Sequence, residues 1–87
     1  MPDGYQIIFQ PKVRRDLKFI PRDDLNRILK RTEALASDPR PPGSINVGDP
    51  AMYRVRQGDY RIIYQVDDAR RVVHILTVGH RREVYRS

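Results

Sequence analysis

Three arginines, Arg54, Arg56 and Arg61, flank a Gly58-Asp59 pair in the stretch MYRVRQGDYRIIYQV. The aromatic and β-branched residues on both sides of this pair alternate with period two, which predicts two strands joined by a two-residue type II′ turn. Such a turn places Arg56 directly opposite Arg61, with Arg54 on the same face of the sheet. Because like charges in opposite positions destabilise a sheet, the arrangement indicates a site for an anion.

A set of arginines with tyrosine and one histidine can cleave RNA without a metal, because RNA carries its own nucleophile, the ribose 2′-hydroxyl. The protein must hold this hydroxyl in line with the phosphorus, neutralise the charge that develops on the phosphorane and move two protons. Guanidinium groups suit the second task. Tyrosine, with a pKa of about 10 in water, is a poor base, but nearby guanidinium groups favour its phenolate and lower that pKa.

Other kinds of chemistry find little support in the sequence. There is no glycine-rich phosphate loop of the Walker or Rossmann kind, which argues against nucleotide-driven chemistry. His74 and His80 lie outside any HExxH or H-x-E pattern, and no cluster of carboxylates accompanies the arginines, which argues against metal-dependent catalysis. We therefore expect no metal and no other cofactor.

Length and composition indicate one domain that spans residues 1–87. A hydrophobic content of 39% with 32% charged residues is typical of a folded globule. Cysteine is absent, which excludes disulfides. The first residues lack the features of a signal peptide, and no apolar run approaches the ~18 residues of a membrane span. We expect a cytoplasmic protein without a membrane partner.

The net charge of +6 is unevenly distributed along the chain. Residues 52–87 carry eight basic residues, all of them arginines, against four acidic ones. Arginine suits bidentate contacts with phosphate, so this half of the chain indicates a nucleic-acid or acidic protein partner. On charge alone, a solvated basic surface explains the composition equally well.

The apolar pattern predicts an α+β fold in the order β-α-α-β-β-β, with two N-terminal helices packed on a mostly antiparallel four-stranded sheet. The uncovered face of the sheet would then carry Arg54, Arg56 and Arg61. The segment 37–50 is rich in proline and glycine and predicts a loop without helix or strand. The expected strands are 5–9, 52–57, 60–66 and 72–78, with Gly79 ending the last, and the expected helices are 11–20 and 23–36. The second helix has an apolar stripe of Leu25, Ile28, Leu29, Leu35 and Ala36.

The segments YRVRQGDYRIIYQVDD and ILTVGHRREVY resemble the RelE branch of the RelE/ParE toxin superfamily, and the resemblance covers essentially the whole chain. It implies a RelE-like fold and a type II toxin–antitoxin toxin that cleaves mRNA in the ribosomal A site and so inhibits translation. It also implies metal-independent attack by the 2′-hydroxyl. The implied partners are a cognate antitoxin and the 70S ribosome with mRNA, and DNA binding is expected only through an antitoxin complex.

The resemblance gives catalytic roles to three residues. Arg61 matches the arginine that stabilises the scissile phosphate. Arg81 matches the arginine that protonates the leaving 5′-oxygen or stabilises charge there. Tyr85 matches the C-terminal tyrosine that abstracts the 2′-hydroxyl proton or stacks on the substrate base.

Three further residues are implied to bind RNA. Arg54 and Arg56 stand where some family members have lysines, and arginine does not donate a proton at neutral pH, which argues against general-acid duty there. His80 stands where a lysine is common, and an imidazole could take over part of the proton transfer.

Two alternatives remain open at this point. The ParE branch shares the fold but inhibits DNA gyrase and typically lacks the arginine and tyrosine set. A catalytically degenerate toxin that serves only as a binding partner would keep the fold without the activity.

Overall fold

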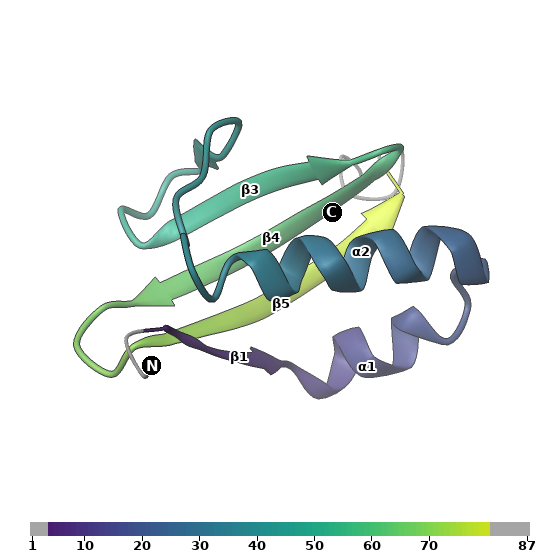
Figure 1. Ribbon diagram of the computed structural model, residues 1–87, viewed down its shortest axis with the longest axis horizontal. Coiled ribbons are helices and arrows are strands. Elements are labelled where there is room, and N and C mark those ends of the chain that lie inside the picture. Colours follow the sequence, from purple (N-terminus) through teal and green to yellow (C-terminus); the bar gives the residue numbers. More distant parts are fainter. Residues whose placement is uncertain (1–3, 81–87) are drawn as a thin grey trace.

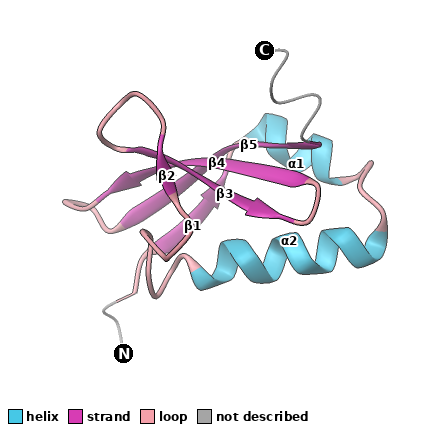
Figure 2. Ribbon diagram, turned by 90° about the horizontal axis from the view of Figure 1, so that it is seen from above, coloured by secondary structure: helices cyan, strands magenta, loops and turns pink. Residues whose placement is uncertain are grey.

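A computed structural model describes residues 4–80 of the chain (Figure 1). The two helices lie on one face of the sheet, as the view from above also shows (Figure 2). The predicted α+β class and the order of its main elements are therefore confirmed. The elements are β1 (Gln6–Phe9), α1 (Pro11–Leu17), α2 (Arg22–Ala34), β2 (Ile45–Asn46), β3 (Met52–Gln57), β4 (Tyr60–Asp67) and β5 (Val72–His80).

The sheet has five strands in the order β1-β5-β4-β3-β2, one more than the four expected. The additional strand, β2, lies in the segment 37–50, where we expected no strand. Ile45 pairs with Arg54 and Asn46 with Tyr53, antiparallel to β3. The side-chain amide of Asn46 donates to the carbonyls of Asp49 and Met52, both at 3.0 Å, which closes the loop onto the sheet. β1 pairs with β5 in parallel, so the sheet is mixed, and all its other pairings are antiparallel.

Local chemistry explains where the helices begin. Pro11 is the first residue of α1, a position where its missing N–H costs no hydrogen bond. α1 is shorter than expected, because the chain leaves the helix after Leu17 and closes tight turns such as Phe19 N–H to Asp16 O at 3.1 Å. Asp23 and Asp24 occupy the first turn of α2, where the helix dipole favours negative charge.

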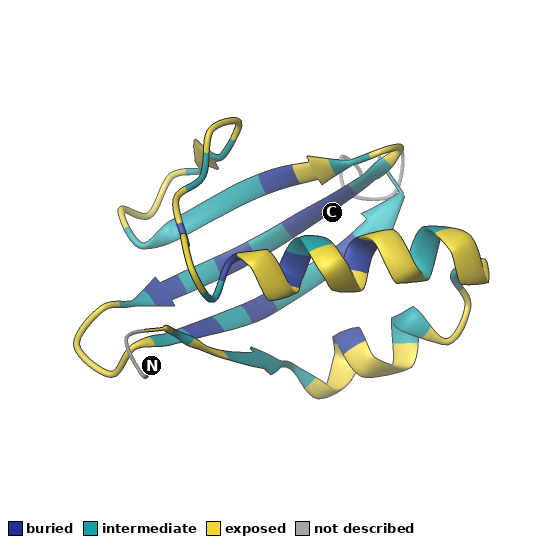
Figure 3. Ribbon diagram, viewed as in Figure 1, coloured by how far each residue is buried: buried dark blue, intermediate teal, exposed yellow. Residues whose placement is uncertain are grey.

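The core lies between the helices and the sheet (Figure 3). Ile28 on α2 and Leu35 just after it are buried as expected, but Leu29 is 38% exposed and Thr32 is buried in its place. Thr32 donates its hydroxyl to the Leu29 carbonyl at 2.9 Å, which satisfies this polar group inside the core. The buried hydrophobic residues are Val13, Ile28, Leu35, Val55, Ile62, Tyr64, Val66, Val73, Ile75 and Val78.

Candidate nucleic-acid interface

The β3–β4 hairpin has the predicted register. Arg56 pairs with Arg61, and Arg54 pairs with Ile63. Gly58 has a φ of 60°, and Asp59 is not among the residues with positive φ, as a type II′ turn requires. Two residues of turn are enough to fix every pairing further along the hairpin.

The three arginines share the face of the sheet that points away from the helices, called here the arginine face and defined by Arg54, Arg56 and Arg61. The assignment follows from alternation along the strands, because the intervening Val55 and Ile62 are buried in the core beneath the helices. The structure therefore brings these arginines together.

Their exposure differs in a way that the sequence did not predict. Arg56 is exposed and Arg54 is intermediate, but Arg61 is only 7% exposed although it lies on the face that the helices leave uncovered. β4 lies inside the sheet, with β3 and β5 on either side. On β5 the residue opposite Arg61 is Gly79, which has no side chain to displace it. A buried guanidinium on a central strand is held more rigidly than an exposed one, which suits charge stabilisation at a fixed point.

His80 does not lie with the arginines. We expected the last strand to end at Gly79, but β5 continues through His80. Because side chains alternate along a strand, His80 points to the helix side and pairs there with Tyr60. The two rings make an edge-to-face contact, with centroids 5.7 Å apart and an angle of 82° between planes. His80 therefore lies on the opposite face of the sheet from Arg54, Arg56 and Arg61, and its RNA-binding role stays a prediction.

Arg81 and Tyr85, predicted to be catalytic, lie outside the described residues. Their roles stay predictions.

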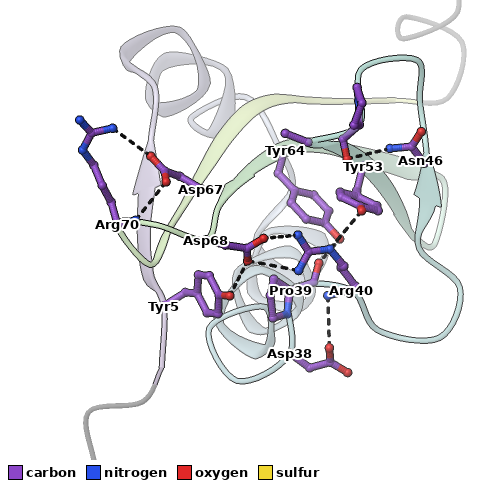
Figure 4. A network of polar contacts seen from close by, with 12 residues as sticks. Tyr5, Asp38, Pro39, Arg40, Asn46, Tyr53, Tyr64, Asp67, Asp68 and Arg70 are labelled. Carbon is purple, nitrogen blue, oxygen red and sulfur yellow. Dashed lines mark hydrogen bonds and ion pairs between the residues drawn. The ribbon is translucent and has the colours of Figure 1, made fainter.

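A polar cluster holds the 37–50 loop at the edge of the sheet, on the side that faces the helices (Figure 4). Arg40 donates to both carboxylate oxygens of Asp68, at 2.7 and 3.3 Å, and its Nε donates to the Tyr53 hydroxyl at 3.0 Å. The Tyr5 hydroxyl donates to the same carboxylate at 2.6 Å. This cluster, called here the Arg40 clamp and defined by Tyr5, Arg40, Tyr53 and Asp68, joins the start of the chain, the 37–50 loop, β3 and the β4–β5 turn.

The Arg40 clamp changes the acidity of its members. Hydrogen bonds from Arg40 and Tyr5 hold the pKa of Asp68 below its usual range, and the same carboxylate raises the pKa of Tyr5. Sequence reasoning missed these residues, because partners so far apart in the chain leave no local pattern. Since the Arg40 and Asp68 side chains are 40% and 57% exposed, solvent screens their attraction, and the clamp orients the loop more than it stabilises the fold.

Tyr64 anchors the same loop from inside the core. Its hydroxyl donates to the Pro39 carbonyl at 2.7 Å, and burial raises its pKa to about 12. A tyrosine held neutral in this way has a structural role, which leaves base catalysis to another group.

Residues 4–80 were searched for metal-binding clusters and for membrane-spanning helices. No three histidine or carboxylate side chains among them lie close enough together to hold a metal ion. None of the helices in this part of the chain is long and apolar enough to cross a membrane.

Comparison with known proteins gives the family. The family model described as the ParE toxin of the type II toxin–antitoxin system parDE matches residues 7–85. Toxin RelG of Mycobacterium tuberculosis is 33% identical over 88 residues, covering 94% of this chain and 97% of the relative.

Solved structures agree with this match. A chain of the RelBE2 toxin–antitoxin complex from Mycobacterium tuberculosis superimposes with a TM-score of 0.78 at 28% identity, covering 88% of this chain and 98% of its own. A chain of the archaeal RelE–RelB complex from Pyrococcus horikoshii also gives 0.78 at 28% identity, covering 90% and 96%. The sheet, the helical pair and the matched length together show that this chain belongs to the RelE/ParE toxin family of type II toxin–antitoxin systems.

Proposed function

We propose that this toxin is an endoribonuclease that cleaves mRNA in the ribosomal A site and thereby inhibits translation. The observation that carries the proposal is the arginine face: Arg61 is buried on the central strand, opposite the exposed Arg56, with Arg54 beside them. Such a cluster stabilises a phosphorane, which bears more negative charge than the phosphodiester from which it forms. The similarity to toxin RelG supports a role as a toxin.

In the proposed reaction, the ribose 2′-oxygen attacks the adjacent phosphorus while the bond from phosphorus to the 5′-oxygen breaks. The products are a 2′,3′-cyclic phosphate and a free 5′-hydroxyl, and the step needs neither a metal nor another cofactor. Arg61 stabilises the non-bridging oxygens, and Arg54 and Arg56 hold flanking phosphates. Arg81 protonates the leaving 5′-oxygen, or stabilises its charge while water supplies the proton. Tyr85 removes the 2′-hydroxyl proton or stacks on the base. His80 is left out of this set because its side chain lies on the helix side.

The proposed protein partner is a cognate antitoxin that covers the helices and the basic half of the chain. Two structural relatives are chains of complexes that include an antitoxin or RelB, and the net charge of +6 suits an acidic segment. Co-purification with the product of an adjacent small acidic open reading frame at low salt tests this proposal. Failure of that chain to bind the toxin would contradict it.

Primer extension on mRNA tests the nuclease. Ribosomes that hold a defined mRNA with an empty A site are incubated with the toxin, and the 5′ ends are mapped. We expect cuts within the A-site codon, retained after chelation of free metal where ribosomes stay intact, and lost with Arg61→Ala. Cuts at random positions, or none, would contradict the proposal.

Gyrase inhibition is the second candidate, because the matching family model is that of a ParE toxin. A supercoiling assay with purified gyrase separates the two candidates. A ribonuclease leaves supercoiling unchanged at concentrations that cut mRNA, whereas a gyrase inhibitor blocks supercoiling and leaves mRNA intact. Inactivity in both assays, together with antitoxin binding, would indicate a degenerate toxin.

A further inference from the structure

A small cavity opens on the helix side of the sheet, at the end where β5 finishes. It measures about 110 Å³ and is lined by Phe19, Ile20, Tyr60, Val78, Gly79 and His80. The connection between α1 and α2 supplies the first two of these residues and lies beside the end of β5 (Figure 1). Sites for drug-sized ligands are roughly 300–1,000 Å³, so this cavity is too small for such a ligand and suits a planar group that stacks at its opening.

Aromatic side chains surround the opening. Phe19 is 86% exposed, far more than the other exposed large hydrophobic residues of the described chain, Leu29 and Ile45. One exposed apolar side chain is ordinary on a protein surface. Phe19, however, lies at the rim of a cavity that already contains the edge-to-face pair of Tyr60 and His80. Three rings at one opening form a platform of the kind on which nucleobases stack.

The cavity lies one row of residues beyond the buried arginine. Tyr60 precedes Arg61 on β4, and His80 follows Gly79, the residue opposite Arg61 on β5. Neighbouring rows of a sheet are separated by about 3.4 Å along the strand. Arg61 points to the arginine face, whereas Tyr60 and His80 point to the helix side. A strand of RNA must therefore pass around this end of the sheet to set a phosphate against the arginine face and turn a neighbouring base toward the cavity.

The surface around Phe19 is basic. The segment 11–22 contains one acidic residue, Asp16, and five exposed basic ones: Lys12, Arg14, Arg15, Lys18 and Arg22. None of the ion pairs between described residues involves these five. Such a charge balance favours a polyanion over a neutral or purely apolar occupant of similar size.

We propose that the Phe19, Tyr60 and His80 cavity holds a base of the messenger strand next to the scissile phosphate. This inference rests on the proposed ribonuclease function and adds a base-stacking subsite to it. Stacking on aromatic rings tolerates every base, because each has a π-face, so the subsite positions the strand with little sequence preference.

The test uses 70S ribosomes programmed with an mRNA that carries 2-aminopurine beside the cut. A 2′-deoxy nucleotide at the scissile position prevents cleavage, and stacking is read as fluorescence quenching. Wild-type toxin should quench the signal, and Phe19→Leu, which keeps the apolar character without the ring, should bind about tenfold more weakly with little quenching. Phe19→Tyr should keep both properties. Leu29→Ala, a change at another exposed apolar residue, serves as the matched control and should behave as wild type. Phe19 is so exposed that its replacement should leave the melting temperature unchanged.

Each contrary result has a separate reading. If wild-type toxin cuts unmodified mRNA and Phe19→Leu quenches normally, the stacking subsite is wrong and the nuclease stands. If wild-type toxin cuts no mRNA, the proposed function fails first. If Phe19→Leu loses the same affinity on an mRNA that lacks the base at that position, the ring contacts ribosomal RNA and not the messenger base. If Phe19→Leu weakens only the binding of the antitoxin, the Phe19 ring contacts a protein partner. Either assignment overturns the proposal.

Discussion

Arg56 and Arg61 face each other across β3 and β4, but their surroundings give them different roles. Arg56 is exposed, so water and salt screen its repulsion from Arg61, and it can follow a mobile phosphate. Arg61 is 7% exposed and fixed on an inner strand. A charge held in place before the reaction stabilises the transition state without reorganising, which is the property that catalysis needs.

Replacement of Arg61 should affect the chemical step. We expect Arg61→Ala to raise the barrier to cleavage by about 2–4 kcal/mol, as for removal of a preorganised oxyanion donor. Arg61→Lys should restore only part of the rate, because an ammonium cannot make the bidentate contact. Single-turnover cleavage on saturating programmed ribosomes measures this step. A rate near that of the wild type for Arg61→Ala would remove Arg61 from catalysis.

The same two positions should differ in stability. Arg56→Ala relieves a like-charge pair and should leave the free energy of unfolding unchanged or higher by up to about 1 kcal/mol. Arg61→Ala relieves the same pair but also removes a buried side chain and leaves a void, so it should be less stable than Arg56→Ala. Urea unfolding of both variants gives the comparison. Equal stabilities would show that the burial of Arg61 contributes nothing to the fold.

Asp68 should make stability depend on pH. Arg40 and Tyr5 hold the pKa of Asp68 below its usual range. The contribution of Asp68 to the free energy of unfolding is therefore complete at a pH above its pKa in the unfolded chain, about 3.9. The contribution is lost as pH falls through the lower folded-state pKa. Asp68→Asn should therefore be less stable at neutral pH and decline less on acidification. Asp59→Asn, in the exposed turn, is the matched control for urea unfolding between neutral and acid pH. A decline as steep in Asp68→Asn as in the wild type would contradict the assignment.

At the scale of elements, the β3–β4 hairpin sets the geometry of the arginine face. A two-residue turn fixes the register locally, which is why the sequence predicted the Arg56 and Arg61 pairing correctly. The start of α1 at Pro11 and the acidic first turn of α2 were predictable for the same reason, since each depends on neighbouring residues.

Features that depend on distant partners were not predictable. β2 has two residues and exists only because β3 offers an edge to pair with. The last strand was expected to end at Gly79, but β5 continues through His80, and alternation along the strand points its side chain away from the arginine face. Thr32 and Leu29 exchange their expected burial because the contact face of α2 is set by the sheet beneath it. The burial of Arg61 was not predictable either, because a strand pattern gives the face on which a residue lies and not how far it is buried.

The turn itself can be tested. Gly58 has a φ of 60°, and a β-carbon there would meet no atom within 4 Å, so any penalty comes from the backbone alone. Gly58→Ala should lower the free energy of unfolding by about 1–2 kcal/mol. Gly58→Asn should cost less, because asparagine tolerates this region better. Thermal unfolding of the two variants checks the order, and an alanine variant as stable as the wild type would argue against the type II′ turn.

At the scale of the whole molecule, the net charge of +6 should govern encounter with the ribosome. Affinity for a single strand falls with salt by a logarithmic slope of about 0.7 for each phosphate contact. Arg54→Ala and Arg56→Ala should each flatten that slope by about this amount and leave the single-turnover rate at saturation largely intact. Binding measured across a range of salt concentrations tests this, and an unchanged slope in both variants would mean that neither residue contacts a phosphate.

The parallel pairing of β1 with β5 affects how fast the chain folds. Gln6 pairs with Val72 and Phe9 with Ile75, so the first strand waits for the last one before it can join the sheet. A topology of such high contact order folds slowly, because the entropy of closing a long loop is lost before the contact is gained. The residue opposite Arg61 also lies on β5. The β3–β4 hairpin can form earlier, but Arg61 gains its neighbour on β5 only after that strand has been synthesised. This delay leaves an interval in which a partner can bind the chain as it folds.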